Sequence, residues 1–204
     1  MRSVARHLSV EAMSLYHHLA GKEALLDALA DFVFTLIDLP QPGEPWRAAT
    51  ERRAFSTRRV LAAHPWAPGL MNSRPVPGPA LMRHHDRALG AFLGDGFAVP
   101  LASSAVSMID AYVYGVALTE QSLPFSAENE TDDYAATLDV PMSEYPNLVR
   151  MMREFFGGDG PKRNYEFADE FTIGLDLILD AIEQRRARDA LAATSVSPSG
   201  TRKS

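Results

Sequence analysis

Residues 101–123 form an almost uninterrupted apolar stretch, in which Asp110 and Glu120 are the only charged side chains. The length and composition of this stretch favour one long helix, and a helix that is apolar on nearly every face is buried on more than one side. Apolar residues also recur at helical spacing in the segments before and after it. No segment shows the alternating pattern of a half-buried strand. The sequence therefore predicts an all-α protein.

The expected helices are separated by clear breaks. Helices are predicted over residues 2–8, 12–19, 22–39, 45–64, 80–93, 101–123, 148–156 and 165–188. Pro40-Gln41-Pro42-Gly43 interrupts the pattern and marks a boundary. Residues 65–79, which hold five prolines, should form short helical turns and loops. A polar, acidic segment at 124–146 is expected to be a mobile loop. We divide the chain into a head (residues 1–39), a body (residues 45–190) and a disordered tail (residues 191–204).

Charge is distributed unevenly between these parts. The whole chain has a formal net charge of −6, whereas residues 1–22 carry Arg2, Arg6 and Lys22 against Glu11, so 3 − 1 = +2. A small basic head on an acidic body is compatible with DNA binding. Cysteine is absent, which excludes a disulfide framework and a thiolate metal site. We find no signal peptide and no run of apolar residues typical of a membrane span, so a cytoplasmic protein without membrane contact is expected.

The head has the pattern of a helix-turn-helix motif. A short helix over residues 2–8 is followed by a tight turn at Ser9-Val10-Glu11 and by a second short helix over residues 12–19. In such motifs the second helix lies in the major groove of DNA. Leu15 and Leu19 share one face of that helix and should point inward. Lys22, at the start of the next helix, is placed to meet a phosphate.

The same segment closely resembles the tetracycline-repressor (TetR) family of transcriptional regulators. Residues 4–27 read VARHLSVEAMSLYHHLAGKEALLD, and the family pattern is a short helix, Leu-Gly-Val, a Ser/Thr-Leu-Tyr-x-His helix, then Lys and a Leu-Leu pair. Architectural similarity extends over nearly the whole chain. The resemblance implies a ligand-responsive repressor that binds a palindromic operator as a homodimer and needs no cofactor. It also assigns DNA-facing positions: Arg2, Ala12, Met13, Tyr16, His17, His18 and Lys22.

Within that set, the resemblance makes Tyr16 and Lys22 phosphate contacts and makes Ala12, Met13 and His17 base-facing. Four departures from the family pattern stand out. Ser9 occupies the glycine position of the turn, where a left-handed backbone would be costly for serine. His17 replaces a tryptophan of the tetracycline repressor. Leu70 falls where that repressor has a magnesium-binding histidine, which argues against tetracycline–magnesium as the effector.

The fourth departure is that the family's first helix has no counterpart, because Met1 already stands at the start of the motif. We therefore expect that residues preceding Met1 belong to the head, and that this chain binds DNA poorly without them. The head would then be a helix-turn-helix remnant in which Val4, Leu8, Leu15 and Leu19 lack part of their packing.

The body is expected to dimerise and to bind a small molecule. The helices over residues 101–123 and 165–188 carry more apolar surface than one monomer's core needs, so two copies of each should form a symmetric four-helix interface. An apolar or amphipathic effector should bind inside the other helices. The predicted pocket residues are His64, Trp66, Met71, Met82, Met108 and Tyr112.

Two alternative functions remain open from the sequence. One is a helical ligand-binding dimer that has lost DNA binding through the shortened head. The more remote one is a small helical hydrolase or metalloprotein. Only scattered histidines such as His84-His85 support it. No phosphate-binding loop, HExxH or GxSxG motif occurs. No enzyme activity, catalytic residue or metal site is therefore predicted.

Overall fold

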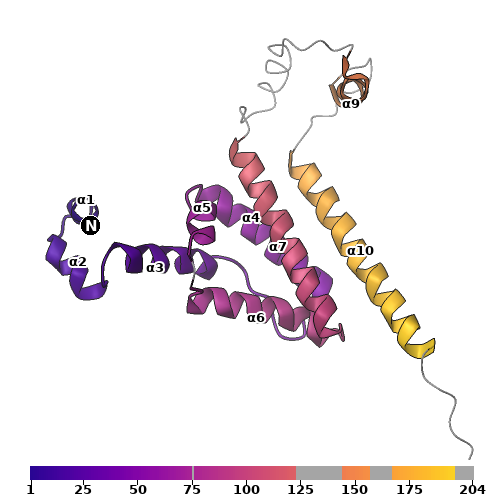
Figure 1. Cartoon of the computed structure of the whole chain (residues 1–204), viewed down its shortest axis with the longest axis horizontal. Helices are drawn as coiled ribbons and strands as arrows, with labels where there is room; N and C mark the ends of the chain where they lie inside the picture. The colour runs from indigo at the N-terminus through magenta and orange to yellow at the C-terminus, as the bar shows by residue number, and fades with distance from the viewer. Residues whose placement is uncertain (75, 123–143, 157–166, 196–204) are drawn as a thin grey trace, which may run out of the picture.

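The computed structural model describes residues 1–74, 76–122, 144–156 and 167–195, and within these ranges the regular structure is helical, without strands (Figure 1). The predicted all-α class is confirmed. The helices are α1 (Arg2–His7), α2 (Ala12–His18), α3 (Lys22–Thr35), α4 (Trp46–Ala63), α5 (Ala67–Asn72), α6 (Pro79–Gly94), α7 (Val99–Ser122), α9 (Pro146–Phe156) and α10 (Phe167–Ser195).

The helices are arranged as a small head joined to a larger body. Helices α1 and α2 pack against each other at one end of the molecule, and α3 runs from them to the body (Figure 1). In the body α4, α6 and α7 pack against one another, α3 contacts α5 and α6, and α10 lies along α7. The chain crosses from α3 to α4 through residues 36–45, which we call the connector.

Buried apolar side chains form two separate clusters. The first lies around α7, α10 and the far end of α6, and includes Trp46, Phe92, Ile109, Phe171 and Leu179. The second lies nearer the head, where α3 meets the other body helices. Its buried members are Val33, Phe34, Ile37, Val60, Leu61, Ala67, Ala80 and Ala117, with Met71, Leu81 and Tyr114 packed against them. The body thus has two apolar centres.

Most helix boundaries lie within two residues of the prediction, with two differences. Helix α3 ends at Thr35 rather than at residue 39, because Ile37 turns into the core and the Asp38 N–H donates to Ser56 Oγ at 3.0 Å. The short helix α5 lies within residues 65–79, where short helical turns and loops are predicted. Helix α10 continues to Ser195, beyond the predicted helix end at residue 188 and into the segment where a disordered tail is predicted. The predicted loop at 124–143 lies outside the described residues.

Helix α7 is the one described helix that is long and apolar enough to cross a membrane by length and composition. Its packing gives another reason for this composition, because α4, α6 and α10 all contact it. Its residues Ala102, Ala105, Val106 and Ile109 are fully buried. The helix therefore has the surroundings of a core helix.

Candidate nucleic-acid interface and ligand-binding body

A tight turn fixes the angle between the two short helices of the head. At the end of α1 the Val10 N–H donates to the Ala5 carbonyl at 3.0 Å, and the Ser9 N–H donates to the Arg6 carbonyl at 3.2 Å. This pair of bonds is the Schellman arrangement, which needs a left-handed residue at its corner. Ser9 is that residue, with φ of 56°. Serine therefore has the left-handed backbone that is expected to cost conformational energy at this position.

Helix α2 presents its larger side chains to solvent. Met13 is 66% exposed and Tyr16 is 49% exposed. His17 and His18 are also exposed, whereas Leu15 and Leu19 are half-buried, in line with their predicted inward face. The side chain of Ala12 lies outside the described residues. The base-reading and phosphate-binding roles of these residues stay predictions.

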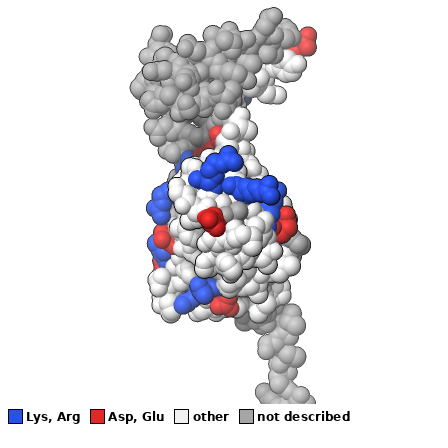
Figure 2. Space-filling view, turned by 90° about the vertical axis from the view of Figure 1, so that its left-hand side faces the viewer, with Lys and Arg blue, Asp and Glu red and all other residues white. Residues whose placement is uncertain are grey.

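The basic residues of the head are free of acidic partners. Within the described part of the chain, no ion pair involves Arg2, Arg6 or Lys22, and all three are exposed. Figure 2 looks onto this end of the molecule and shows several basic groups, with acidic groups among them, around a surface that is otherwise largely uncharged. Helix α3 begins at Lys22, so its free N–H groups and the lysine lie together. This combination suits a phosphate backbone.

Two acidic residues of α3 and one basic residue after α5 join the head to the body. Arg74 bonds Glu23 at 2.8 Å and Asp27 at 3.3 Å. One turn further along α3, Asp31 accepts hydrogen bonds from the Ala80 and Leu81 N–H groups at 3.0 and 2.9 Å. Asp31 therefore caps the first turn of α6 from a different helix. A displacement of α6 would therefore shift α3 directly through the Asp31 hydrogen bonds.

The structure places the six predicted pocket residues on several different segments of the body. Trp66, Met82 and Met108 are about half exposed on three different helical segments. His64 is held by the Val60 carbonyl at 2.9 Å, while its ring meets the Trp66 ring edge-on. The remaining two are Met71, which packs on the second apolar cluster, and Tyr112, whose hydroxyl donates to the Phe171 carbonyl at 3.0 Å. Their assignment to one pocket remains a prediction.

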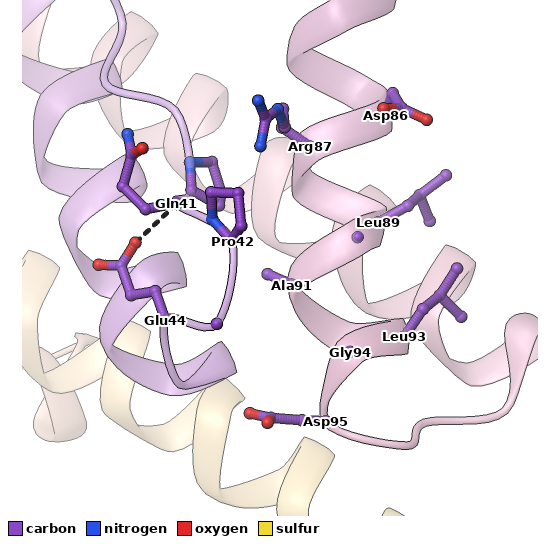
Figure 3. A pocket seen from close by; sticks show the side chains of 13 residues that line it. Gln41, Pro42, Glu44, Asp86, Arg87, Leu89, Ala91, Leu93, Gly94 and Asp95 are labelled. Carbon is purple, nitrogen blue, oxygen red and sulfur yellow. Dashed lines mark hydrogen bonds between the residues drawn. The ribbon is translucent and has the colours of Figure 1, made fainter.

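Two of the surface hollows in the described body lie beside α7 and α6. One, of about 380 Å³, lies between α7 and α10 and is lined by Tyr112, Gly115, Val116 and Phe171 among others. At Gly174, on the facing helix, a Cβ would collide with the Tyr112 hydroxyl. Helices α7 and α10 therefore approach each other closely at this point. The other hollow, of about 590 Å³, lies between the connector and α6, with Gln41 and Glu44 on one side and Arg87 on the other (Figure 3).

A group of buried polar side chains lies inside the body. Arg53 on α4 is 2% exposed and bonds Asp110 on α7 through Nη1 at 2.6 Å. His84 on α6 is 3% exposed, and its pKa falls from 6.5 to about 4, mainly because burial disfavours the charged ring and also because Arg53 repels it. Burial raises the pKa of Tyr114, and the charge of Asp110 adds to this. We call Arg53, His84, Asp110 and Tyr114 the polar layer.

The sequence interpretation missed this layer, although one signal was present. Ala80, His84, Ala88 and Phe92 recur every four residues along α6, and all four are buried. A histidine in the middle of such a stripe must lie in the core. The sequence interpretation had weighed His84 only with His85 as a metal ligand. In the described part of the chain, no group of three or more potential metal-binding side chains is found.

Comparisons with known proteins agree with this architecture. A family model described as tetracyclin repressor-like, C-terminal domain, matches residues 39–186. The chain is 35% identical to the HTH-type transcriptional repressor DrrR1 of Streptomyces coeruleorubidus, over 93% of this chain and 73% of that protein. It is 28% identical to the tetracycline repressor protein class C of Escherichia coli, over 91% of this chain and 81% of that protein. The crystal structure of the TetR family protein ActR of Streptomyces coelicolor with actinorhodin matches with a TM-score of 0.69 and 26% identity, covering 91% of this chain and 87% of that one.

Proposed function

Because the chain belongs to the TetR family of transcriptional regulators, we propose that α2 reads an operator through the exposed face that carries Met13, Tyr16 and His17. The protein is a ligand-responsive DNA-binding regulator and not an enzyme. The observation that carries the assignment of the reading face is the exposure of Met13 and Tyr16 beside unpaired Lys22. We assign phosphate contacts to Tyr16 and Lys22, with Arg2 and His18 at the edges of the interface. The place of action is then the cytoplasm, where the DNA is.

The reading unit that we propose is a homodimer formed through α7 and α10. Ile173 and Leu177 lie one turn apart on α10 and are 58% and 66% exposed, and Met108 and Leu118 on α7 are 46% and 45% exposed. Apolar side chains of this size favour burial against a second copy. A two-fold axis through this surface brings two copies of each helix into one bundle. The same axis sets two heads on the half-sites of a palindrome.

The effector acts, in this proposal, on the contacts that join α3 to α5 and α6. An effector that shifts α6 moves the N–H groups bonded to Asp31, and a shift of α5 moves Arg74 away from Glu23 and Asp27. Since α3 begins directly after α2, either movement changes the spacing of the two heads in the dimer. Binding of the effector and of DNA are then linked through one free energy of coupling.

The DNA-binding proposal is tested with a duplex selected by the wild-type protein from a random library. Fluorescence anisotropy then compares Tyr16→Ala and Lys22→Ala with Arg83→Ala, a control that removes an exposed basic residue from α6. The head variants should bind about 10 to 100 times more weakly, and Lys22→Ala should lower the salt slope by about one. The control should bind like wild type. Equal losses in all three variants would contradict the proposed interface.

A further inference from the structure

The polar layer separates the two apolar clusters of the body. On α6, His84 is one turn from Ala80 in the second cluster and one turn from Ala88 in the first. Arg53 precedes Ala54 of the first cluster and lies two turns before Val60 and Leu61 of the second. A continuous apolar core would be more stable than one divided by ionisable groups. The division therefore calls for a functional reason.

Two atoms of the layer are buried without a hydrogen-bond partner among the described residues. They are Arg53 Nη2 and His84 Nε2. Arg53 uses Nη1 for Asp110 at 2.6 Å, so its second terminal nitrogen still has protons to donate. Folded proteins leave few buried polar atoms unsatisfied, and each one weakens the fold unless water or a ligand completes it. These two come from facing helices, α4 and α6.

The charges of the polar layer limit which kind of ligand could form hydrogen bonds with Arg53 Nη2 and His84 Nε2. The carboxylate of Asp110 already neutralises the Arg53 guanidinium. The low pKa of His84 keeps its ring uncharged near pH 7, and the raised pKa of Tyr114 keeps its phenol protonated. An anionic ligand would find no uncompensated positive charge here, and a cation would meet the guanidinium. A hydrocarbon would leave both nitrogens unsatisfied.

We propose that the polar layer is the polar anchor of the effector site, where Arg53 Nη2 and His84 Nε2 hydrogen-bond one uncharged phenol or ketone oxygen of an otherwise apolar molecule. The apolar part of the molecule lies against the second apolar cluster, whose Phe34 ring is 5.4 Å from the His84 ring. Met71 and Leu81 belong to the same surface. This inference rests on the proposed ligand-responsive function and adds the chemical class of the effector.

The chemical class of the effector is tested by calorimetric titration of the protein with three aromatic probes that share a naphthalene ring. These are 2-naphthol, with a neutral oxygen, naphthalene, without oxygen, and 2-naphthoate, with a charged carboxylate. The neutral oxygen should raise affinity about tenfold over naphthalene, as expected for one or two buried hydrogen bonds. The carboxylate should bind more weakly than 2-naphthol. Tightest binding by 2-naphthoate, equal binding by all three, or no heat from any probe at its solubility limit would overturn the proposal.

His84→Leu tests the anchor itself, with His85→Leu as the matched control on the exposed neighbouring position. His84→Leu should lower the affinity for 2-naphthol about tenfold, to that of naphthalene, and should raise the melting temperature because an unsatisfied buried group is removed. The control should change neither value. A lower melting temperature with unchanged 2-naphthol affinity would assign His84 a purely structural role and overturn the proposal.

Operator binding without any probe separates this inference from the proposed function. If His84→Leu and wild type bind the selected duplex equally well but neither distinguishes 2-naphthol from naphthalene, the anchor is refuted and DNA binding stands. If neither protein binds DNA while 2-naphthol still binds about tenfold more tightly than naphthalene, the anchor stands and the regulatory function fails. Arg53→Met serves as a second variant, with the same expected loss of preference for 2-naphthol.

Discussion

The head and the body use similar apolar residues with opposite outcomes. In α1 and α2 the only buried side chain described is that of Ala5, while Val4, Leu8 and Met13 are exposed. In the body, side chains such as Phe92 and Leu179 are 1% and 0% exposed. The difference is one of layers, since α4, α6 and α7 each pack against at least two other helices, whereas α1 packs against α2. Burial energy thus holds the body together, and the head keeps its side chains available for a partner.

The pairing of charged side chains also differs between the body and the head. In the body, several basic side chains pair with acidic ones: Arg53 with Asp110, Arg58 with Glu120, and Arg47 with Asp180. In the head, Arg2 and Lys22 have no acidic partner among the described residues. Paired charges fix one internal arrangement, whereas unpaired ones attract a polyanion. Four substitutions or conditions test this contrast, in order of decreasing expected effect.

The largest effect is expected at the apolar surface of α10, which is exposed although other large apolar side chains of the body are buried. Leu177→Glu places a charge on the α10 surface and should give a monomer, because a buried unpaired carboxylate cannot be accommodated in an apolar interface. Loss of the second head should weaken operator binding about 1,000-fold. Light scattering and anisotropy measure the two effects. Val76→Glu, at an equally exposed site outside α7 and α10, is the control, and a dimeric Leu177→Glu would refute the interface.

The second effect concerns the pH dependence of the body. Since the folded pKa of His84 is about 4, below the value of 6.5 in the unfolded chain, the unfolded state binds more protons between these values. Stability should therefore be complete above about pH 6.5 and should fall by about 3 kcal/mol as the pH drops to 4. Urea unfolding at several pH values measures this loss. In His84→Leu the histidine contribution should vanish, and an unchanged profile in that variant would exclude His84 as its source.

The sequence predicted the elements of both regions but not the connections inside the body. The helix-turn-helix pattern, the long apolar helix α7 and the division near Pro40 were all readable, because they depend on local periodicity and on proline. The Arg53–Asp110 pair joins residues far apart in the chain, and local patterns carry no information on such pairing. The same limit explains why the six predicted pocket residues include neither Arg53 nor His84.

Asp31 lies where the two regions meet, and its removal should have the third largest effect. Asp31→Ala leaves the Ala80 and Leu81 N–H groups without their cap, which should lower the free energy of unfolding by about 1 to 2 kcal/mol. Trp46 and Trp66 belong to the body. Their fluorescence during urea unfolding therefore reports whether the body is destabilised by the substitution. Asp27→Ala removes only an exposed ion pair with Arg74 and should change stability by less than about 0.5 kcal/mol. Equal effects of the two variants would contradict the capping role.

The smallest effect is expected within the head and should favour stability. Ser9 has φ of 56° at the corner between α1 and α2, a conformation that costs a residue with a Cβ about 1 kcal/mol more than glycine. Ser9→Gly should therefore stabilise the head by about 1 kcal/mol, with both Schellman bonds retained. The same substitution inside a helix, Ser14→Gly, should instead destabilise α2 by about 0.5 kcal/mol.

Hydrogen exchange of the amides in residues 4–19 is the appropriate measurement for this pair, because global unfolding reports mainly on the body. Exchange should slow about fivefold in Ser9→Gly and quicken in Ser14→Gly, since about 1 kcal/mol corresponds to that factor. The amides of α4 and α7 should exchange as in wild type in both variants. If Ser9→Gly also protected the body amides, the head and body would unfold as one unit, and the contrast between a loosely packed reading head and a fully packed body would fail.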